Sequence, residues 1–594
     1  MNGRVPEKKG NRATERPQQK TSHVLRRLWR YLAGHHMAII AAFLLSVSGN
    51  LLSLAVPRIS GYAIDAIAPG DEAMRQVLRY VIMMVILALV SAVFSWLLSA
   101  VLIRLSRSVV HRMRKDLFDH LTTLPVSFFD THQTGDVISV LSYDVDTVGS
   151  SIATDVTQIL TSIITVIGSF SMMIGISPVL LLVFLFTIPA SVFFTRFRSR
   201  LVRPLFRKRS SALGAMNGYV EETVSGLRTV RAYRQEEEFC RRFEERNQDA
   251  SMSQWKADSA SCITGPSVNL INNISLALVS VFGSLLFMAN SITLGGVSTF
   301  ILYSRKFSGP INEFANIISE LQSTLAAAER VLNLCDLEPE AEDAPDALPV
   351  PDCEGRIEFR DVSFGYTPDT RVLHNISFTA EPGKVIAIVG ETGCGKTTLI
   401  NLLMRFYDVS EGSILLDGND LRSLRRDDLR RQFTMVLQDT WLFDGTVAEN
   451  LAYGRPGVTS EEIKNAAKAA HIHEMIRSMP NGYDTPITGS GNSISKGQKQ
   501  LLTIARAMLI PSSILILDEA TSNVDTRTEQ QIRDAMLALQ RGKTCFIIAH
   551  RLSTIVGADM ILVMDKGRIA ECGTHAELLK KQGVYAALYN AQFG

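Results

Sequence analysis

The sequence predicts an all-α transmembrane domain of six helices, followed by an α/β domain that contains a phosphate-binding loop (P-loop). Two observations support this division. The first half of the chain holds several long apolar stretches without charge, and a helix needs about 20 such residues to cross the hydrocarbon core of a bilayer. The second half holds a glycine-rich loop, Gly390 to Thr398 (GETGCGKTT), between a strand-like run and a helical run.

The amino-acid composition also differs between the two halves of the chain. A chain of 594 residues is too long for one hydrophobic core. Charged residues make up 20% of it, and the shortage falls in the first half, whereas the second half reads like a soluble protein. A net charge of +2 gives no sign of a nucleic-acid partner, and we expect none. The cysteines have no C-x-x-C spacing and no neighbouring His cluster, which argues against a disulfide framework or a zinc site.

The predicted transmembrane domain covers residues 23–336. Uncharged runs at 37–57 and 80–103 each predict one span. The runs at 156–195 and 259–304 are twice as long and are interrupted by turn residues, so each predicts two spans. The total is six. A large soluble helical core is the alternative, and it is disfavoured because soluble helices rarely run this far without a charged face.

Lysines and arginines predict the orientation. They are concentrated in the N-terminal tail and in the loops after the second and fourth spans, which share one side of the membrane if there are six spans. That side is therefore expected to be cytoplasmic. Residues 1–22 are polar and basic and predict a disordered cytoplasmic tail rather than a signal peptide. Residues 23–32 alternate basic and apolar groups, which predicts an elbow helix that lies on the lipid of the inner leaflet.

Arg305 and Lys306 are unusual because they fall roughly ten residues into the predicted sixth span. Charges at that depth line an aqueous cavity, snorkel to the interface or pair structurally. The sequence leaves these alternatives open.

A linker at residues 337–354, acidic and rich in proline, precedes the α/β domain at 355–594. In the P-loop, glycines let backbone N–H groups approach phosphates, and the following helix adds the positive end of its dipole. We expect Lys396 to reach the β- and γ-phosphates of ATP, and Thr397 to ligate Mg²⁺. The other loop residues expected to line the ATP are Gly390, Glu391, Thr392, Gly393, Cys394, Gly395 and Thr398.

A second apolar strand, Ile514 to Leu517, ends in the acids Asp518 and Glu519. An aspartate at this place can hold Mg²⁺, directly or through water, and Glu519 can polarise the attacking water. A buried strand capped by two solvated acids is the alternative. It is disfavoured because a P-loop precedes the strand.

With these motifs the chain resembles the ATP-binding cassette (ABC) exporters of the half-transporter type, over nearly its whole length. The resemblance rests on the order of the motifs FGY, VLQD, ISKGQ (494–498), TSNVD and IAHR after the P-loop. In the membrane half, LPVSFFDTHQTGDVIS (124–139) and VEETVSGLRTVRAY (220–233) resemble the two cytoplasmic coupling regions. The resemblance implies a dimer in which two cassettes enclose two ATP molecules head to tail.

The resemblance also implies roles for single residues. Tyr366 stacks on adenine. Gln438 senses Mg²⁺, helps to ligate it and contacts the membrane domain, and His550 contacts the γ-phosphate. The signature motif supplies Ser495, Gly497 and Gln498 to the ATP of the partner, and Asp525 lies in the loop that crosses the dimer interface.

The chain departs from the family in its signature motif. Lys496 replaces the first glycine of the usual LSGGQ, and residues 488–491 (TGSG) replace a run that usually contains a glutamate. Glu519 and His550 are intact, so the chain resembles the catalytic-glutamate subunit of bacterial heterodimeric exporters. We therefore favour a heterodimer with a second half-transporter over a homodimer, which stays possible.

The leading hypothesis is an exporter subunit of a bacterial plasma membrane, with its ATPase domain in the cytoplasm. It would move amphipathic small molecules, such as drugs, lipids or peptides, outward by alternating access. The alternative is an ATP-gated channel or a sensor that uses the cassette for signalling. An intact Glu519 favours turnover over gating.

Overall fold

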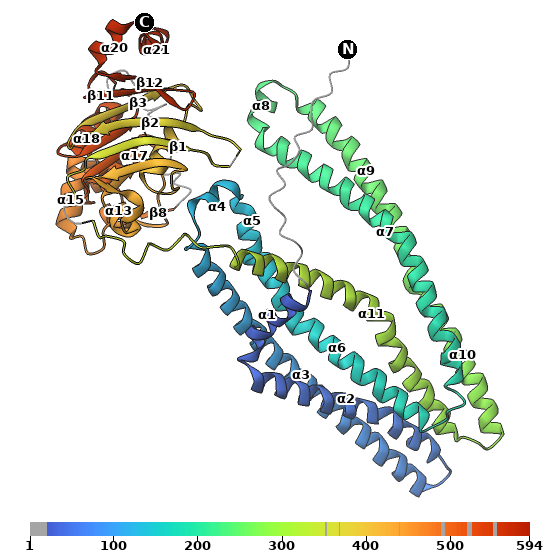
Figure 1. Ribbon diagram of the computed structural model, residues 1–594. Helices are drawn as coiled ribbons and strands as arrows, with labels where there is room; N and C mark the ends of the chain where they lie inside the picture. The colour runs from blue at the N-terminus through green and yellow to red at the C-terminus, as the bar shows by residue number, and fades with distance from the viewer. Residues whose placement is uncertain are drawn as a thin grey trace. The chain divides into compact units, whose positions relative to one another are not determined.

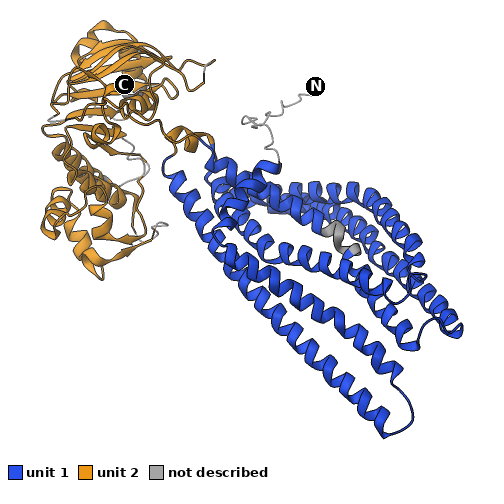
Figure 2. Ribbon diagram, turned by 60° about the horizontal axis from the view of Figure 1, so that its bottom comes forward, with its two compact units in different colours: residues 1–123, 132–337 blue, residues 124–131, 338–594 orange. Residues whose placement is uncertain are grey.

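The computed structural model describes residues 21–350, 353–367, 369–438, 440–488, 494–518, 525–549 and 555–593, with only the backbone at 21, 311–316, 526 and 592–593. Two compact units are formed, by residues 1–123 with 132–337 and by residues 124–131 with 338–594 (Figure 2). The chain passes from the first unit to the second between Leu337 and Glu338. The exception is residues 124–131, from the first coupling region, which cluster with the second unit.

The first unit is all-helical (Figure 1). Its elements are α1 (Thr21–Ala33), α2 (His36–Asp65), α3 (Asp71–Leu121), α5 (Thr134–Ser139), the π-helix η1 (Val140–Asp144), α6 (Val145–Ile174), α7 (Leu182–Ser225), α8 (Leu227–Ala232), α9 (Glu236–Cys262), α10 (Thr264–Met288) and α11 (Leu294–Cys335). α2 lies beside α3, α6 and α11, while α7 packs along α9 and α10.

Within the described residues, five helical stretches are long and apolar enough to cross a membrane: 36–65, 71–121, 134–174, 182–225 and 236–288. The chain is thus a multi-pass membrane protein. The helix α11, expected as the sixth span, is not among the five, and it carries Arg305 and Lys306 in its apolar part. The six-span count therefore stays a prediction. The 51 residues of α3 extend about 77 Å, far more than a bilayer core requires, as expected for helices that continue beyond the membrane.

The helices α2 and α11 approach each other closely. A β-carbon on Gly61 of α2 would lie 2.0 Å from the Thr299 hydroxyl oxygen, so only glycine allows this approach. At the same end of the pair, the Asp65 carboxylate accepts hydrogen bonds from the Thr293 hydroxyl and the Gly295 N–H, both at 2.7 Å.

The second unit is an α/β domain built on three sheets. The strands are β1 (Ile357–Phe364), β2 (Leu373–Ala380), β3 (Val385–Gly390), β4 (Glu411–Leu416), β5 (Asn419–Asp420), β6 (Phe433–Val436), β7 (Gly445–Thr446), β8 (Pro486–Ile487), β9 (Ile514–Asp518), β10 (Thr544–Ile548), β11 (Met560–Asp565) and β12 (Arg568–Gly573). The six-stranded sheet has the order β12-β11-β3-β10-β9-β6, and its inner neighbours pair in parallel. A second sheet has the order β2-β1-β4-β5, and β7 pairs with β8.

Helical elements complete this unit. They are α4 (Val126–Thr131), α12 (Lys396–Leu403), the 3₁₀ helix η2 (Leu421–Ser423), α13 (Arg426–Arg431), α14 (Val447–Ala452), α15 (Ser460–Ala469), α16 (His473–Arg477), the 3₁₀ helix η3 (Gly482–Asp484), α17 (Lys496–Met508), α18 (Thr526–Gln540), α20 (His575–Lys581) and α21 (Val584–Phe593). The strands β3, β9 and β10 are buried along most of their length because helices cover them, as expected for a parallel sheet.

The acidic linker packs on the α/β domain. Arg426 donates to the Asp343 carboxylate from its backbone N–H at 2.9 Å and from its guanidinium at 3.1 Å. Arg430 forms an ion pair with Glu340. Leu348 pairs with Leu424 through a parallel β-bridge. The acids of the linker thus meet basic residues around α13.

Candidate active site

Parallel strands bring most of the predicted site to one edge of the six-stranded sheet. The strand β3 ends in Gly390, β9 ends in Asp518, and Gln438 follows the end of β6. The strand β10 lies between β3 and β9, in register with both. The carboxyl ends of these strands meet at the same edge, where α/β sheets bind their ligands.

Two glycines allow the P-loop to turn from β3 into α12. Gly395 has a φ of 104°, a backbone conformation that favours glycine, and it is the N-cap of α12. A β-carbon on Gly390 would lie 2.3 Å from the carbonyl oxygen of Met564 in β11. The first N–H groups of α12 have no partner within the helix, so this turn favours an anion.

The P-loop itself holds the ammonium group of Lys396. Nζ donates to the carbonyl oxygens of Gly390 at 2.7 Å and Glu391 at 2.9 Å. Both acceptors are neutral, and a charged phosphate oxygen is a stronger acceptor for an ammonium group. The Cys394 thiol is buried beneath the loop, and burial raises its pKa, so this cysteine is expected to be unreactive.

The side chains predicted to hold Mg²⁺ carry the donors that this ion prefers. Thr397 is exposed in the first turn of α12, Gln438 is exposed after β6, and Asp518 is partly exposed at the end of β9. Hydroxyl, amide and carboxylate oxygens are hard ligands, so the donor set fits Mg²⁺. Within the described residues, His, Cys, Asp and Glu form no cluster of three or more that could be a rival metal site.

Tyr366, predicted to stack on adenine, lies beside the P-loop helix. Its ring is 46% exposed, which leaves it room to stack with a base. Its hydroxyl donates to the buried Thr398 hydroxyl at 3.0 Å and accepts from Asn401 at 3.4 Å. Thr398, expected to line the ATP, therefore orients Tyr366 here.

Tyr407, which the sequence did not single out, lies against the predicted adenine platform Tyr366. Its ring meets the ring of Tyr366 edge-on, with centroids 5.1 Å apart. Its hydroxyl donates to Asp130 Oδ2 at 2.6 Å, and Asp130 lies in α4 of the first coupling region. Burial, reinforced by this hydrogen bond, raises the pKa of Tyr407. A continuous chain of contacts thus runs from the expected adenine platform to a segment of the membrane half of the sequence.

We expect Tyr407→Phe to weaken coupling more than ATP hydrolysis. The phenylalanine keeps the ring contact with Tyr366 but loses the hydrogen bond to Asp130, which is worth about 1–2 kcal/mol for a charged acceptor at an exposed site. The number of substrate molecules moved per ATP should fall several-fold, while ATP turnover changes by less than about twofold. Transport and phosphate release measured on the same proteoliposomes give the ratio. An unchanged ratio would show that this contact carries no coupling.

The signature segment forms the start of α17. Ser495 is the N-cap, and it exchanges hydrogen bonds with Gln498 in a capping box, at 3.0 and 3.3 Å. Gly497 is buried in the first turn, whereas Lys496 is exposed there. A cation is disfavoured at a helix N-terminus, by about 0.3–1 kcal/mol, so Lys496 brings no helix stability.

Asp525 caps α18, and the last catalytic candidates are not described. The Asp525 carboxylate accepts from the N–H of Thr528 at 2.9 Å, and this hydrogen bond lowers its pKa. Glu519 and His550 lie outside the described residues, so their catalytic roles stay predictions from the sequence.

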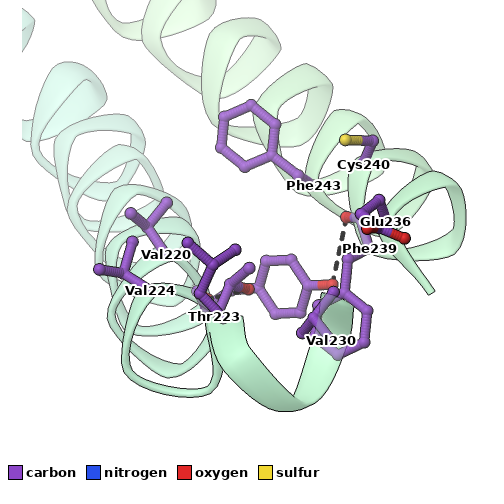
Figure 3. Close-up of a pocket in the computed structure, with 10 residues that line it drawn as sticks. Val220, Thr223, Val224, Val230, Glu236, Phe239, Cys240 and Phe243 are labelled. Atoms are coloured by element: carbon purple, nitrogen blue, oxygen red, sulfur yellow. Dashed lines mark hydrogen bonds between the residues drawn. The ribbon is translucent and has the colours of Figure 1, made fainter. Parts of the chain in front are cut away.

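An apolar hollow of about 230 Å³ lies in the first unit between the second predicted coupling region and the start of α9 (Figure 3). Val220, Thr223 and Val224 of α7 line one side, and Phe239 and Phe243 of α9 line the other. Leu227 and Val230 of α8, between α7 and α9, also line it. A second hollow, of about 120 Å³, lies beside Gln438 in the second unit and is lined by Leu437, Trp441 and Ile510, among others.

Comparisons with known proteins match this architecture. Residues 39–311 match the family model of the ABC transporter transmembrane region, and residues 373–522 match that of the ABC transporter. A fatty acid ABC transporter ATP-binding/permease protein of Mycobacterium tuberculosis is 41% identical, over 95% of this chain and 96% of its own. An uncharacterized ABC transporter ATP-binding protein of Bacillus subtilis is 39% identical, over 99% and 98%. An ATP-dependent lipid A-core flippase of Yersinia pestis is 37% identical, over 97% and 98%.

A solved structure agrees with the fold. The structure of a bacterial Atm1-family ABC exporter with ATP bound superposes with a TM-score of 0.78 at 28% identity, over 94% of this chain and 98% of that one. One family thus accounts for both halves of the chain, for their order and for the P-loop edge. The chain belongs to the ABC transporters, as an exporter half-transporter in which an ATP-hydrolysing cassette drives transport across a membrane.

Proposed function

We propose that this chain is one subunit of a dimeric exporter, with six spans, that moves amphipathic molecules from the cytoplasmic side of a bacterial plasma membrane outward. The observation that carries the proposal is the chain of contacts from Tyr366 through Tyr407 to Asp130, because it connects the P-loop edge to a coupling region. The relatives support the substrate class, since one is named for fatty acids and another for lipid A-core.

The residues at the sheet edge have different roles in the proposed ATP hydrolysis. When bound, Mg·ATP supplies the phosphoanhydride bond and the metal charge that the reaction needs. Lys396 leaves its loop carbonyls for the phosphates, while Thr397, Gln438 and Asp518 offer oxygens for the metal. Glu519, next to Asp518 in the sequence, is proposed to orient and deprotonate the attacking water, and His550 to contact the γ-phosphate.

A second half-transporter completes each ATP site, because ABC exporters work as dimers. We favour a different chain as the partner. The exposed Lys496 alters the signature that this chain lends to its partner, while Lys396, Thr397 and Asp518 keep the side chains that hydrolysis needs. The apolar hollow of α7, α8 and α9 is proposed to receive the cassette of this partner.

The test is transport into inverted membrane vesicles, with this chain produced alone and together with a second half-transporter from the same organism. We expect uptake of a fluorescent amphiphile and substrate-stimulated ATPase only for the pair, with turnover at least about tenfold above the chain alone. Glu519→Gln should abolish both activities, because it removes the proposed base. Conversely, robust ATPase from the purified homodimer, abolished by Glu519→Gln, would contradict the heterodimer but leave the exporter in place.

Solute movement in the same vesicles distinguishes the exporter from its rival, an ATP-gated channel or a sensor. A channel lets solute run down its gradient once ATP binds, even in the Glu519→Gln variant. A pump needs turnover for net accumulation. Accumulation against a gradient that stops with Glu519→Gln therefore excludes gating.

A further inference from the structure

Two cations, Arg305 and Lys306, lie in the apolar part of α11, and nothing in the ATP cycle uses them. Lys306 is half-buried against α2. Its Nζ donates to the carbonyl oxygen of Ser53 at 2.9 Å and to the Ser53 hydroxyl at 2.6 Å. Arg305 is exposed on α11 and has no ion-pair partner in the described part of the chain.

The contact of Lys306 has a cause in the sequence of α2. Pro57 has no N–H, so the Ser53 carbonyl, one helical turn earlier, loses its donor within the helix. Lys306 replaces that donor. Along the same seam, the hydroxyls of Tyr303 and Thr299 donate to other carbonyls of α2, at 2.5 and 3.1 Å. Neutral hydroxyls are sufficient donors for these neighbouring carbonyls. The Ser53 carbonyl therefore explains why residue 306 is a hydrogen-bond donor, but it does not explain why that donor carries a charge.

The two charges also lack a counter-ion within the described side chains. Residues 294–310 contain no Asp or Glu, and neither do 36–64, 80–103, 156–174, 182–195 or 264–288. The nearest acid on α2, Asp65, is engaged at the first turn of α11, about 16 Å along that helix from Lys306. Uncompensated cations are costly at membrane depth, and they mark sites that take up an anion or face water.

We infer that Arg305 and Lys306 form the headgroup subsite for the transported amphiphile, and that its acidic group is a carboxylate or a phosphate. The inference rests on the proposed function. Arginine pairs with both groups through a planar fork, and lysine adds a point charge. The Ser53 hydroxyl adds a neutral donor beside Lys306. The headgroup competes with the Ser53 carbonyl for the ammonium group, so its arrival loosens one of the contacts that join α2 to α11.

A matched series of amphiphiles tests the charge preference. The full dimer is reconstituted in phosphatidylcholine vesicles, and ATPase stimulation is measured with dodecanoate, dodecyl phosphate, dodecanol and dodecyltrimethylammonium. The tail is constant, so only the headgroup varies. We expect the two anions to stimulate at concentrations roughly tenfold or more below those needed for the alcohol and the cation.

The variants separate charge from structure. Lys306→Gln keeps an N–H donor for the Ser53 carbonyl but removes the charge, and Arg305→Gln removes the exposed cation. The double variant should lose the preference for anions over dodecanol, and Lys306→Arg should retain it. Lys256→Gln, an exposed cation of α9, is the matched control and should behave like the unchanged protein.

Each other outcome has a defined meaning. If all four amphiphiles stimulate alike, or if the double variant keeps its preference, the subsite is refuted while the exporter stands. If no amphiphile is transported, the proposed function fails and the subsite falls with it. Vesicles with phosphatidylglycerol distinguish a fixed lipid from a substrate: full activation by that lipid, without transport of labelled dodecanoate, would refute the substrate subsite.

Discussion

Replacing Lys396 with alanine is expected to lower ATP turnover at least about 100-fold. The ammonium group is the cation that we expect the P-loop to present to the β- and γ-phosphates, and losing one preorganised donor to a developing charge costs about 3–4 kcal/mol of transition-state stabilisation. In the structure Nζ contacts two loop carbonyls and, at 4.0 Å, the Cys394 sulfur, which are all neutral groups, so alanine leaves no buried charge behind. The fold should therefore survive, and the loss should be specific to catalysis and nucleotide binding.

Phosphate release by the reconstituted dimer measures this effect. The matched control is Lys464→Ala, which removes an exposed lysine of α15 and should leave turnover within about twofold. Binding of a fluorescent ATP analogue and thermal unfolding complete the comparison. If Lys396→Ala kept a third or more of the turnover while Lys464→Ala was unaffected, the loop would not be the catalytic P-loop.

The sheet edge where most of the predicted site residues meet could be expected from the sequence because its parts are local. A strand, a glycine loop and a helix are consecutive in the chain, and parallel pairing of β3, β10 and β9 then places Gly390 and Asp518 at one edge. Tyr366 follows the end of β1 for the same reason, and its role as an adenine platform stays a prediction. The expectation for Glu519 and His550 stays a prediction, because both are outside the described residues.

The contacts that could not be predicted join distant parts of the chain. Tyr407 and Asp130 are 277 positions apart, and no local pattern marks a tyrosine as the partner of one particular aspartate. From its sequence the linker is expected to be only an acidic spacer. In the structure its acids form ion pairs with Arg426 and Arg430 around α13. For Lys306 the sequence left several alternatives open, and it gave no sign of the hydrogen bonds that Nζ donates to Ser53. Only the packing of α2 against α11 could reveal that Pro57 frees the carbonyl which Lys306 meets.

The second large effect is expected at Arg330, which closes the contact between η1 and α11 in the helical unit. Its Nε and an Nη donate to the two oxygens of Asp144, at 2.8 and 2.5 Å. The Asp144 side chain is only 4% exposed, whereas that of Arg330 is 54% exposed. The hydrogen bonds to Asp144 raise the pKa of Arg330. One partner is exposed and the other is buried, so removing Arg330 and removing Asp144 should lower the free energy of unfolding by different amounts.

Arg330→Met leaves a buried carboxylate without its counter-ion. Breaking a fully buried ion pair in this way lowers the free energy of unfolding by about 3–5 kcal/mol. Water reaches the arginine side of this pair, so we expect a loss of about 2–3 kcal/mol. The apparent melting temperature in detergent should fall by about 5 °C. Asp144→Asn should cost less, because it leaves only an exposed guanidinium that water can solvate.

The double variant decides whether the cost comes from the stranded charge. With Asp144→Asn in place, Arg330→Met no longer leaves a carboxylate behind, so the double variant should be more stable than Arg330→Met alone. A coupling of about 2 kcal/mol in this double-mutant cycle is expected for partners in direct contact. Strictly additive effects would mean that Arg330 acts through the packing of its aliphatic part, and that the bidentate ion pair adds nothing to the stability of the helical unit.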